Sequence, residues 1–256
     1  MFRTPLLAVL ALIAAAPSTP RPVAGEVPAR SYPAIETIHW TYGPERLRSG
    51  WATQLRFTHE GMNSRIDADD APEIMGELVS ASSASPGEAV SFRLAHEAGA
   101  LACTGHADGD RKASGTCRFD PDQRFADGLA SRGTPADDSD TLLALALVDA
   151  RLAPVDGLTT EGYRLDDADD LIAIAALKVT PAYAEELRAA GLRTGQLGDL
   201  IAARALKVDA AWLGDMARAG YPDLTIGQAI QMRALGVTPD YAVRMARVLH
   251  AVGEIQ

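Results

Sequence analysis

Long hydrophobic segments are scarce in this chain of 256 residues, which limits how it can meet a membrane. One apolar run, Pro5–Ala16, lies near the N-terminus. The longest later run is Leu142–Val148, and Asp149 and Arg151 follow it. Because a helix needs about 20 apolar residues to cross a bilayer, we expect no transmembrane helix beyond the N-terminal segment.

Positive charge is also in short supply. The chain carries 24 Lys and Arg residues against 34 Asp and Glu residues, which gives a formal net charge of −10 at pH 7. Only Lys112, Lys178 and Lys207 are lysines, and alanine is abundant, as is typical of GC-rich bacterial genes. Because nucleic acids bind basic surfaces, the acidic balance argues against nucleic acid as a partner. The hydrophobic content of 47% is enough for ordinary cores and argues against global disorder.

Recognisable catalytic motifs are missing from the sequence. No serine lies in a Gly-x-Ser-x-Gly motif, there is no glycine-rich phosphate loop, and Asp108-Gly-Asp110 lacks the glycine and glutamate of a calcium loop. The five histidines show no pair at the spacing of zinc ligands: His39, His59, His96, His106 and His250. We therefore expect no catalytic residue, cofactor or metal, although a hydrolase with dispersed carboxylates stays open as an alternative.

The N-terminus has the layout of a secretory signal peptide. Arg3 precedes the apolar run, a proline-rich stretch follows it, and Val23-Ala-Gly25 offers small residues for cleavage before Glu26. Residues 1–25 are therefore predicted to be a signal peptide, and the protein is predicted to be periplasmic or secreted in a bacterium. No cysteine lies near the cleavage site, which argues against lipid attachment there. An uncleaved anchor is the alternative, and it would still leave the rest outside the cytoplasm.

Cys103 and Cys117 are the only cysteines. Two predicted strands, Ala100–Ala107 and Ala113–Phe119, flank a turn-rich segment, and each cysteine lies equally far from Asp110. In a simple hairpin that symmetry places the cysteines opposite each other, where a disulfide can form. We predict a disulfide; a buried thiol pair or a two-cysteine metal site are the alternatives.

Residues 26–132 are predicted to form a small antiparallel β domain with one or two helices. Strand-forming residues concentrate in four more segments: Ile35–Tyr42, Trp51–His59, Met62–Ile66 and Ala89–His96. Helices are predicted at about Pro72–Val79 and at Pro121–Ala130. The acids of Asp67–Asp70 are interpreted as helix caps rather than as a metal loop, because carboxylates at a helix start accept hydrogen bonds from free amides.

Residues 133–249 are predicted to form four repeats with a period of 29 positions, followed by a tail at 250–256. The period is marked by four glycines: Gly133, Gly162, Gly191 and Gly220. An aromatic column runs in parallel through Tyr183, Trp212 and Tyr241, where the first unit has Pro154. The first unit is therefore degenerate. The aromatics are interpreted as core residues of each helix pair, with a recognition stripe as the alternative.

Each unit is predicted to be a helix, a tight turn, a second helix and a glycine stop. Leu171–Leu177 has helix formers at helical spacing, and Thr180-Pro181 supplies an N-cap followed by a helix-starting proline. Glycine can then close the second helix in the left-handed conformation. The acids of Asp137–Asp140 and Asp166–Asp170 precede first helices, and we interpret them as caps rather than as a cation site.

The segments Val179-Thr-Pro-Ala-Tyr183 and Val237-Thr-Pro-Asp-Tyr241 carry a resemblance to a known family. The C-terminal third of the chain resembles helical repeats of bacterial exported proteins of unassigned function. Similar repeats follow the peptidase domain of some beta-lactam-sensor-type antirepressor metallopeptidases. No activity carries over, because His96-Glu97 is not followed by the second histidine that such a peptidase needs to hold zinc.

These patterns predict an α+β fold, a β-rich domain followed by a short α-solenoid. A repeated scaffold without catalytic motifs favours an exported, non-enzymatic protein that binds a protein partner in the cell envelope through its repeat surface. The alternative is an envelope-polymer-binding protein or hydrolase that uses the β-rich domain. A polar ligand pocket between that domain and Gly133 would favour the alternative.

Overall fold

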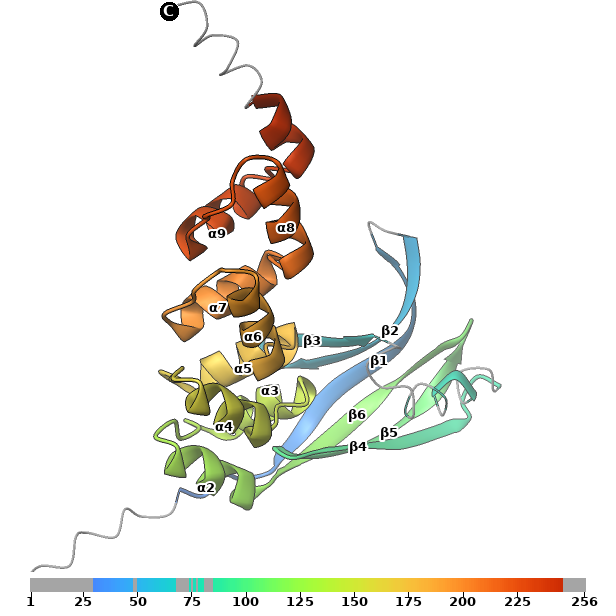
Figure 1. The fold of residues 1–256 in the computed structure, drawn as a ribbon. Coiled ribbons are helices and arrows are strands. Elements are labelled where there is room, and N and C mark those ends of the chain that lie inside the picture. The colour runs from blue at the N-terminus through green and yellow to red at the C-terminus, as the bar shows by residue number, and fades with distance from the viewer. Residues whose placement is uncertain are drawn as a thin grey trace, which may run out of the picture. The chain divides into compact units, whose positions relative to one another are not determined.

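A six-stranded antiparallel sheet is followed by a series of helices in the computed structural model of the chain (Figure 1). The structure describes residues 30–47, 50–67, 74, 76, 78–80 and 85–245. The predicted signal peptide at 1–25, the tail at 250–256 and much of the helix predicted at Pro72–Val79 lie outside these residues; Ile74, Gly76 and Leu78–Ser80 are helical. The α+β class with a C-terminal helical array is confirmed.

The sheet consists of two three-stranded meanders joined edge to edge. Its strands are β1 (Ile35–Leu47), β2 (Gly50–His59), β3 (Met62–Asp67), β4 (Ala89–His96), β5 (Gly99–Gly109) and β6 (Lys112–Pro121). Their order is β3-β2-β1-β6-β5-β4, and all neighbours pair antiparallel. The pairing of β1 with β6 is the non-local contact that makes one sheet out of two hairpin series.

One face of the sheet is buried, as the strict alternation of exposed and buried residues along most of β4 shows. The indole of Trp40 lies on this face over a pair of facing glycines, Gly105 and Gly115. A Cβ atom on Gly105 would lie 2.7 Å from the Trp40 ring, so the flat surface requires glycine there. Trp40 donates from Nε1 to the Thr104 carbonyl at 3.2 Å and meets Phe92 edge to face.

Cys103 and Cys117 are cross-strand partners on β5 and β6 and are joined by a disulfide. The register shift in this hairpin lies between Ala107 and Gly109, next to the turn. Because this shift moves the register by one residue between the turn and the cysteines, it places Cys103 opposite Cys117. Both cysteines are buried in the core on the covered face of the sheet.

The helices form two rows whose members recur with the period of the glycines. One row holds α3 (Ser139–Leu147), α5 (Ala168–Leu177), α7 (Leu197–Ala205) and α9 (Ile226–Ala234). The other holds α2 (Gln123–Ser131), α4 (Leu152–Thr160), α6 (Pro181–Ala189) and α8 (Ala210–Arg218), and residues 239–245 are helical at the next position. Neighbours within each row pack together. Because α2 starts one full period before α4, it belongs to the second row, and a division between residues 132 and 133 would separate it from the helices that continue its row.

Each second helix ends at a glycine with a left-handed backbone. The φ angles of Gly133, Gly162, Gly191 and Gly220 are 84°, 96°, 86° and 99°. The next residue then donates its N–H back into the helix, as from Leu192 to the Leu187 carbonyl at 2.9 Å. This is the Schellman arrangement, which satisfies carbonyls that the helix end leaves unpaired.

The first helices end in the same arrangement, and all but one of them do so without glycine. The left-handed residues are Asp149, Lys178, Lys207 and Gly236, with φ of 51°, 55°, 57° and 69°. Val179 and Val208, which follow two of them, donate back to Ile174 and Ala203. Only the last member of this column is a glycine, so the sequence alone gives little sign of it.

Carboxylates and hydroxyls cap the helix starts. Asp138 accepts from the Thr141 backbone N–H at 2.8 Å, and Asp167 accepts from Asp169 and Asp170. The hydrogen bond from Thr141 holds the pKa of the Asp138 carboxyl below its ordinary value. Thr180 accepts from Tyr183 at the start of α6. Asp138 and Asp167 thus act as helix caps.

The core of the sheet continues into the first helices of the array. It includes Leu142, Leu143 and Leu145 of α3 and reaches Leu171 of α5. A second core begins at Leu158 and runs along the rest of the array to Ala242. In Figure 1, α3 lies against the sheet, and the later helices extend away from it.

Candidate binding sites along the helical array

The aromatic column divides between buried and exposed positions. Tyr183 is 3% exposed and donates its hydroxyl to the Val208 carbonyl at 2.6 Å. Burial raises the pKa of this phenol to about 12. Trp212 is 6% exposed, whereas Tyr241 in the outermost unit is 46% exposed. Tyr183 and Trp212 therefore serve as core residues between stacked units.

An arginine from the following unit covers each buried aromatic. The Arg204 guanidinium lies 4.8 Å from the Tyr183 ring centroid, and its Nε donates to the Leu177 carbonyl at 3.1 Å. Arg233, one period later, lies 5.2 Å from the Trp212 ring centroid and donates to the Lys207 carbonyl. We call this arrangement the aromatic–arginine clamp. It closes one unit onto the next by a cation–π contact and by a charge-assisted hydrogen bond.

The clamp is missing where the first unit meets the second. The aromatic column holds Pro154 there, and the arginine column holds Ala175. Both residues line a pocket of about 560 Å³. We call it the junction pocket, because Arg65, Ile66 and His96 of the sheet also line it.

Charged side chains surround the junction pocket. Arg65, Arg151 and Lys178 line it as cations, and Asp149 is the one acid among the lining residues that the structure describes. Arg151 pairs with that acid, with Nη2 2.7 Å from Oδ2. The pocket therefore combines an apolar wall from the array with exposed cationic side chains from both the sheet and the array.

The β4–β5 turn docks against the elbow between α3 and α4. His96 Nδ1 lies 2.5 Å from the Ala146 carbonyl, so this nitrogen carries the proton that is donated. Glu97 accepts from the Leu152 backbone N–H at 3.1 Å and so caps α4. The His96-Glu97 pair matches only the start of a zinc peptidase motif in sequence. In the structure it holds the sheet to the first unit.

A second hollow lies between α6 and α8, where inter-unit ion pairs are replaced by small residues. Earlier interfaces in this helix row carry Arg132–Asp156 at 2.7 Å and Glu161–Arg188 at 2.5 Å. One period after Glu161 and Arg188, the chain has Ala190 and Ala217. Two periods after Asp156, it has Gly214.

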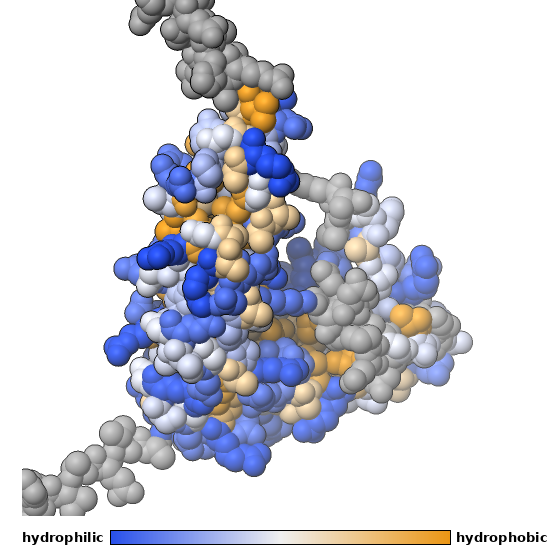
Figure 2. Space-filling view, in the orientation of Figure 1, coloured by the Kyte–Doolittle hydropathy of each residue, from blue (hydrophilic) through white to orange (hydrophobic). Residues whose placement is uncertain are grey.

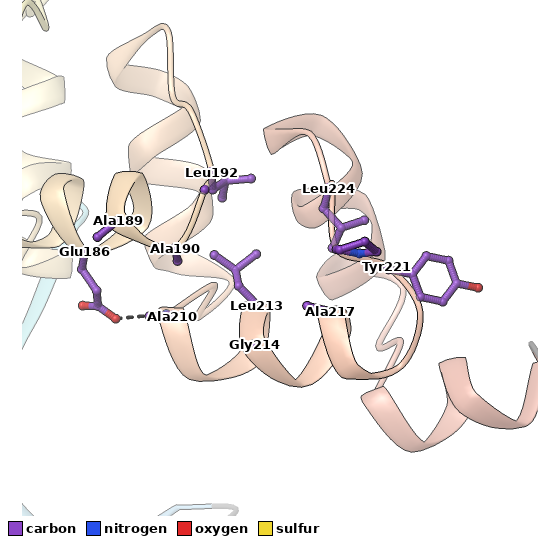
Figure 3. A pocket seen from close by; sticks show the side chains of 12 residues that line it. Glu186, Ala189, Ala190, Leu192, Ala210, Leu213, Gly214, Ala217, Tyr221 and Leu224 are labelled. Carbon is purple, nitrogen blue, oxygen red and sulfur yellow. Dashed lines mark hydrogen bonds between the residues drawn. The ribbon is translucent and has the colours of Figure 1, made fainter.

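This hollow, the α6–α8 groove, encloses about 450 Å³. Leu213 of α8 points toward Leu192 of the loop after α6, and Leu224 lines the side toward α9 (Figure 3). Glu186 accepts from the Ala210 N–H at 3.0 Å and is the one charged residue in the described part of the lining. Figure 2 shows hydrophobic residues gathered on the visible face of the array's outer half.

Three possible metal ligands meet between the sheet and α3. Ligand atoms of His59, Glu60 and Asp140 lie within 4.8 Å of one another. His59 Nε2 is 3.3 Å from an Asp140 carboxylate oxygen, and its Nδ1 is 2.9 Å from the Thr37 carbonyl. No metal site is predicted from the sequence, because His59 and Asp140 lie far apart along the chain. Their contact ties the β2–β3 turn to the array.

No helix among the described residues has both the length and the apolar content to cross a bilayer. Comparison with protein families, curated proteins and solved structures finds no match for this chain.

Proposed function

We propose that this protein is a non-enzymatic interaction protein that binds a protein partner through its helical array. The observation that carries the proposal is the α6–α8 groove, where the ion pairs of earlier interfaces give way to Ala190, Gly214 and Ala217. Small residues let a partner's backbone and apolar side chains approach closely, and Leu192 and Leu213 supply apolar area at the base.

We also propose that the protein acts outside the cytoplasm, in the bacterial envelope or beyond. The Cys103–Cys117 disulfide supports this, because such bonds persist mainly in oxidising compartments. The signal-peptide pattern of residues 1–25 supports it independently. The resemblance to exported proteins with helical repeats points to the same compartment.

The experiment closes the groove with the charges that the previous interface uses. Ala190→Glu with Ala217→Arg places the Glu161–Arg188 pair one unit later. The full chain and this variant are used as baits for crosslinking and affinity capture from native bacterial envelopes. We expect the variant to lose the partner that the unmodified chain captures.

The matched control is Ala205→Arg, which adds a charge at an exposed position of α7 outside the groove lining. It should capture the partner normally. Capture by the closed-groove variant at the unmodified level, with its melting temperature preserved, would contradict the proposal.

The second candidate is an envelope-polymer-binding protein or hydrolase that uses the sheet domain. The junction pocket favours it, because Arg65 and His96 bring polar groups of the sheet to one cavity with the array. A ligand-binding site in that pocket would be unaffected by closing the α6–α8 groove. The two candidates therefore separate in the same set of variants.

A further inference from the structure

The junction pocket occupies a space that the protein's own repeat fills elsewhere. One unit later, the Tyr183 ring and the Arg204 guanidinium meet in the corresponding position. At the junction those columns hold Pro154 and Ala175, and both line the pocket. The filled interface therefore shows which chemical groups fit the open one.

Two acceptors of the filled interface have counterparts in the pocket wall. Val208 accepts the Tyr183 hydroxyl and Leu177 accepts Arg204 through backbone carbonyls. The residues one period earlier are Val179 and Val148, and both line the pocket. Neither Pro154 nor Ala175 has a side-chain donor for these carbonyls.

The apolar part of the wall comes mainly from buried residues. Leu171 is fully buried, and Ile174 and Val179 are nearly so. Such a wall favours a flat hydrophobic body, as in the corresponding space that the Tyr183 ring fills. A phenol suits it, because the ring covers the apolar wall and the hydroxyl can donate to a backbone carbonyl.

The charge of the pocket selects an anion. Arg65 is exposed at the pocket, and Asp149, the one acid among the described lining residues, is paired with Arg151. The exposed Arg65 guanidinium attracts a carboxylate, which it can bind by charge-assisted hydrogen bonds. A cationic ligand would meet the same charges as repulsion.

We infer that the junction pocket binds a small phenolic carboxylate. The ring takes the place of the missing aromatic against Leu171 and Ile174, and the hydroxyl donates to a backbone carbonyl of the wall. The carboxylate lies toward Arg65. This inference goes beyond the proposed partner binding by the array and does not depend on it.

The test is calorimetric titration of the full chain with 3-(4-hydroxyphenyl)propanoate. The key variant is Pro154→Tyr with Ala175→Arg, which installs the clamp and fills the pocket from within. We expect this variant to bind the probe at least tenfold more weakly than the unmodified chain. Its thermal stability should be equal or higher, which separates filling of the pocket from loss of the fold.

Charge is tested on both partners. Arg65→Gln should weaken binding by about tenfold, as loss of a charge-assisted contact does. The methyl ester of the probe should lose a similar factor with the unmodified chain and little with Arg65→Gln. The closed-groove variant Ala190→Glu/Ala217→Arg serves as the control and should bind the probe normally, so partner binding and probe binding fail separately.

Absence of measurable binding by the unmodified chain at millimolar probe would overturn the inference. Equal binding by the pocket-filled variant, or equal binding of acid and ester, would overturn it as well.

Discussion

The interface between the first and second units differs from the interface between the second and third in the two side chains of the clamp. Where the later interface has Tyr183 and Arg204, the earlier one has Pro154 and Ala175. The later interface is closed by a buried phenol and a guanidinium that stacks on it. The earlier one is a pocket that the sheet also lines.

This difference shows that units with similar sequences can have different surfaces. The apolar seam, the caps and the helix stops recur along the array, and they determine the stacking. The positions that break the pattern determine where the array is open. The same holds on the other row, where Ala190 and Ala217 replace an ion pair and leave the α6–α8 groove.

The largest effect is expected from removing the ring that closes the later interface. Tyr183→Ala should lower the free energy of unfolding by about 3 kcal/mol, because it deletes a buried aromatic and its hydrogen bond. Tyr241→Ala, in the same column but 46% exposed, is the matched control and should cost less than about 1 kcal/mol. Urea unfolding followed by circular dichroism measures both. Similar losses would mean that burial does not separate the two positions.

The same phenol should make stability depend on pH in the alkaline range. Burial raises the pKa of Tyr183 from its ordinary 10.0 to about 12 in the folded protein. The unfolded chain therefore loses this proton first, so its contribution to stability is complete below pH 10 and is lost as the pH rises from 10 to 12. Comparison with Tyr183→Phe by urea unfolding across this window isolates the effect. Parallel pH profiles of the two proteins would contradict it.

A smaller loss is expected from removing the arginine of the clamp. Arg204→Ala should cost about 1 to 2 kcal/mol, because it removes the cation–π contact with Tyr183 and the hydrogen bond to the Leu177 carbonyl. Arg193→Ala provides a control at an exposed arginine for which the structure gives no ion pair among the described residues. The comparison fails if both substitutions give the same unfolding midpoint.

The smallest effects are expected at the two kinds of helix stop. Gly191→Ala should cost about 1 kcal/mol, because a Cβ atom is strained at a φ of 86°. Lys207→Gly should raise the free energy of unfolding by less than about 1 kcal/mol, since its φ of 57° favours glycine. Thermal melting of both variants measures the signs. A gain from Gly191→Ala would show that this left-handed turn is not needed.

Much of the fold follows from local patterns in the sequence. The symmetric distance of Cys103 and Cys117 from Asp110 predicts their pairing, and the turn together with the register shift beside it produces that register in the structure. The spacing of the glycines and the Thr180-Pro181 cap likewise predict the helix boundaries of the array. These features depend on interactions within a few residues or within one hairpin.

Other features depend on contacts that no local pattern encodes. The left-handed residues Asp149, Lys178 and Lys207 give no signal, because glycine is absent from these positions. The sequence gives no sign that α2 belongs to the array, because α2 lies before the first glycine of the period. The two pockets become visible only when units are stacked and their facing columns are compared.

The central claim is that the junction is open because Pro154 and Ala175 replace the clamp. The most direct test is a double-mutant cycle with Pro154→Tyr, Ala175→Arg and the double variant, measured by urea unfolding. The clamp predicts that the double variant is more stable than the sum of the single changes by about 1 kcal/mol, as for a ring and guanidinium in contact. Additive effects within experimental error would contradict the claim.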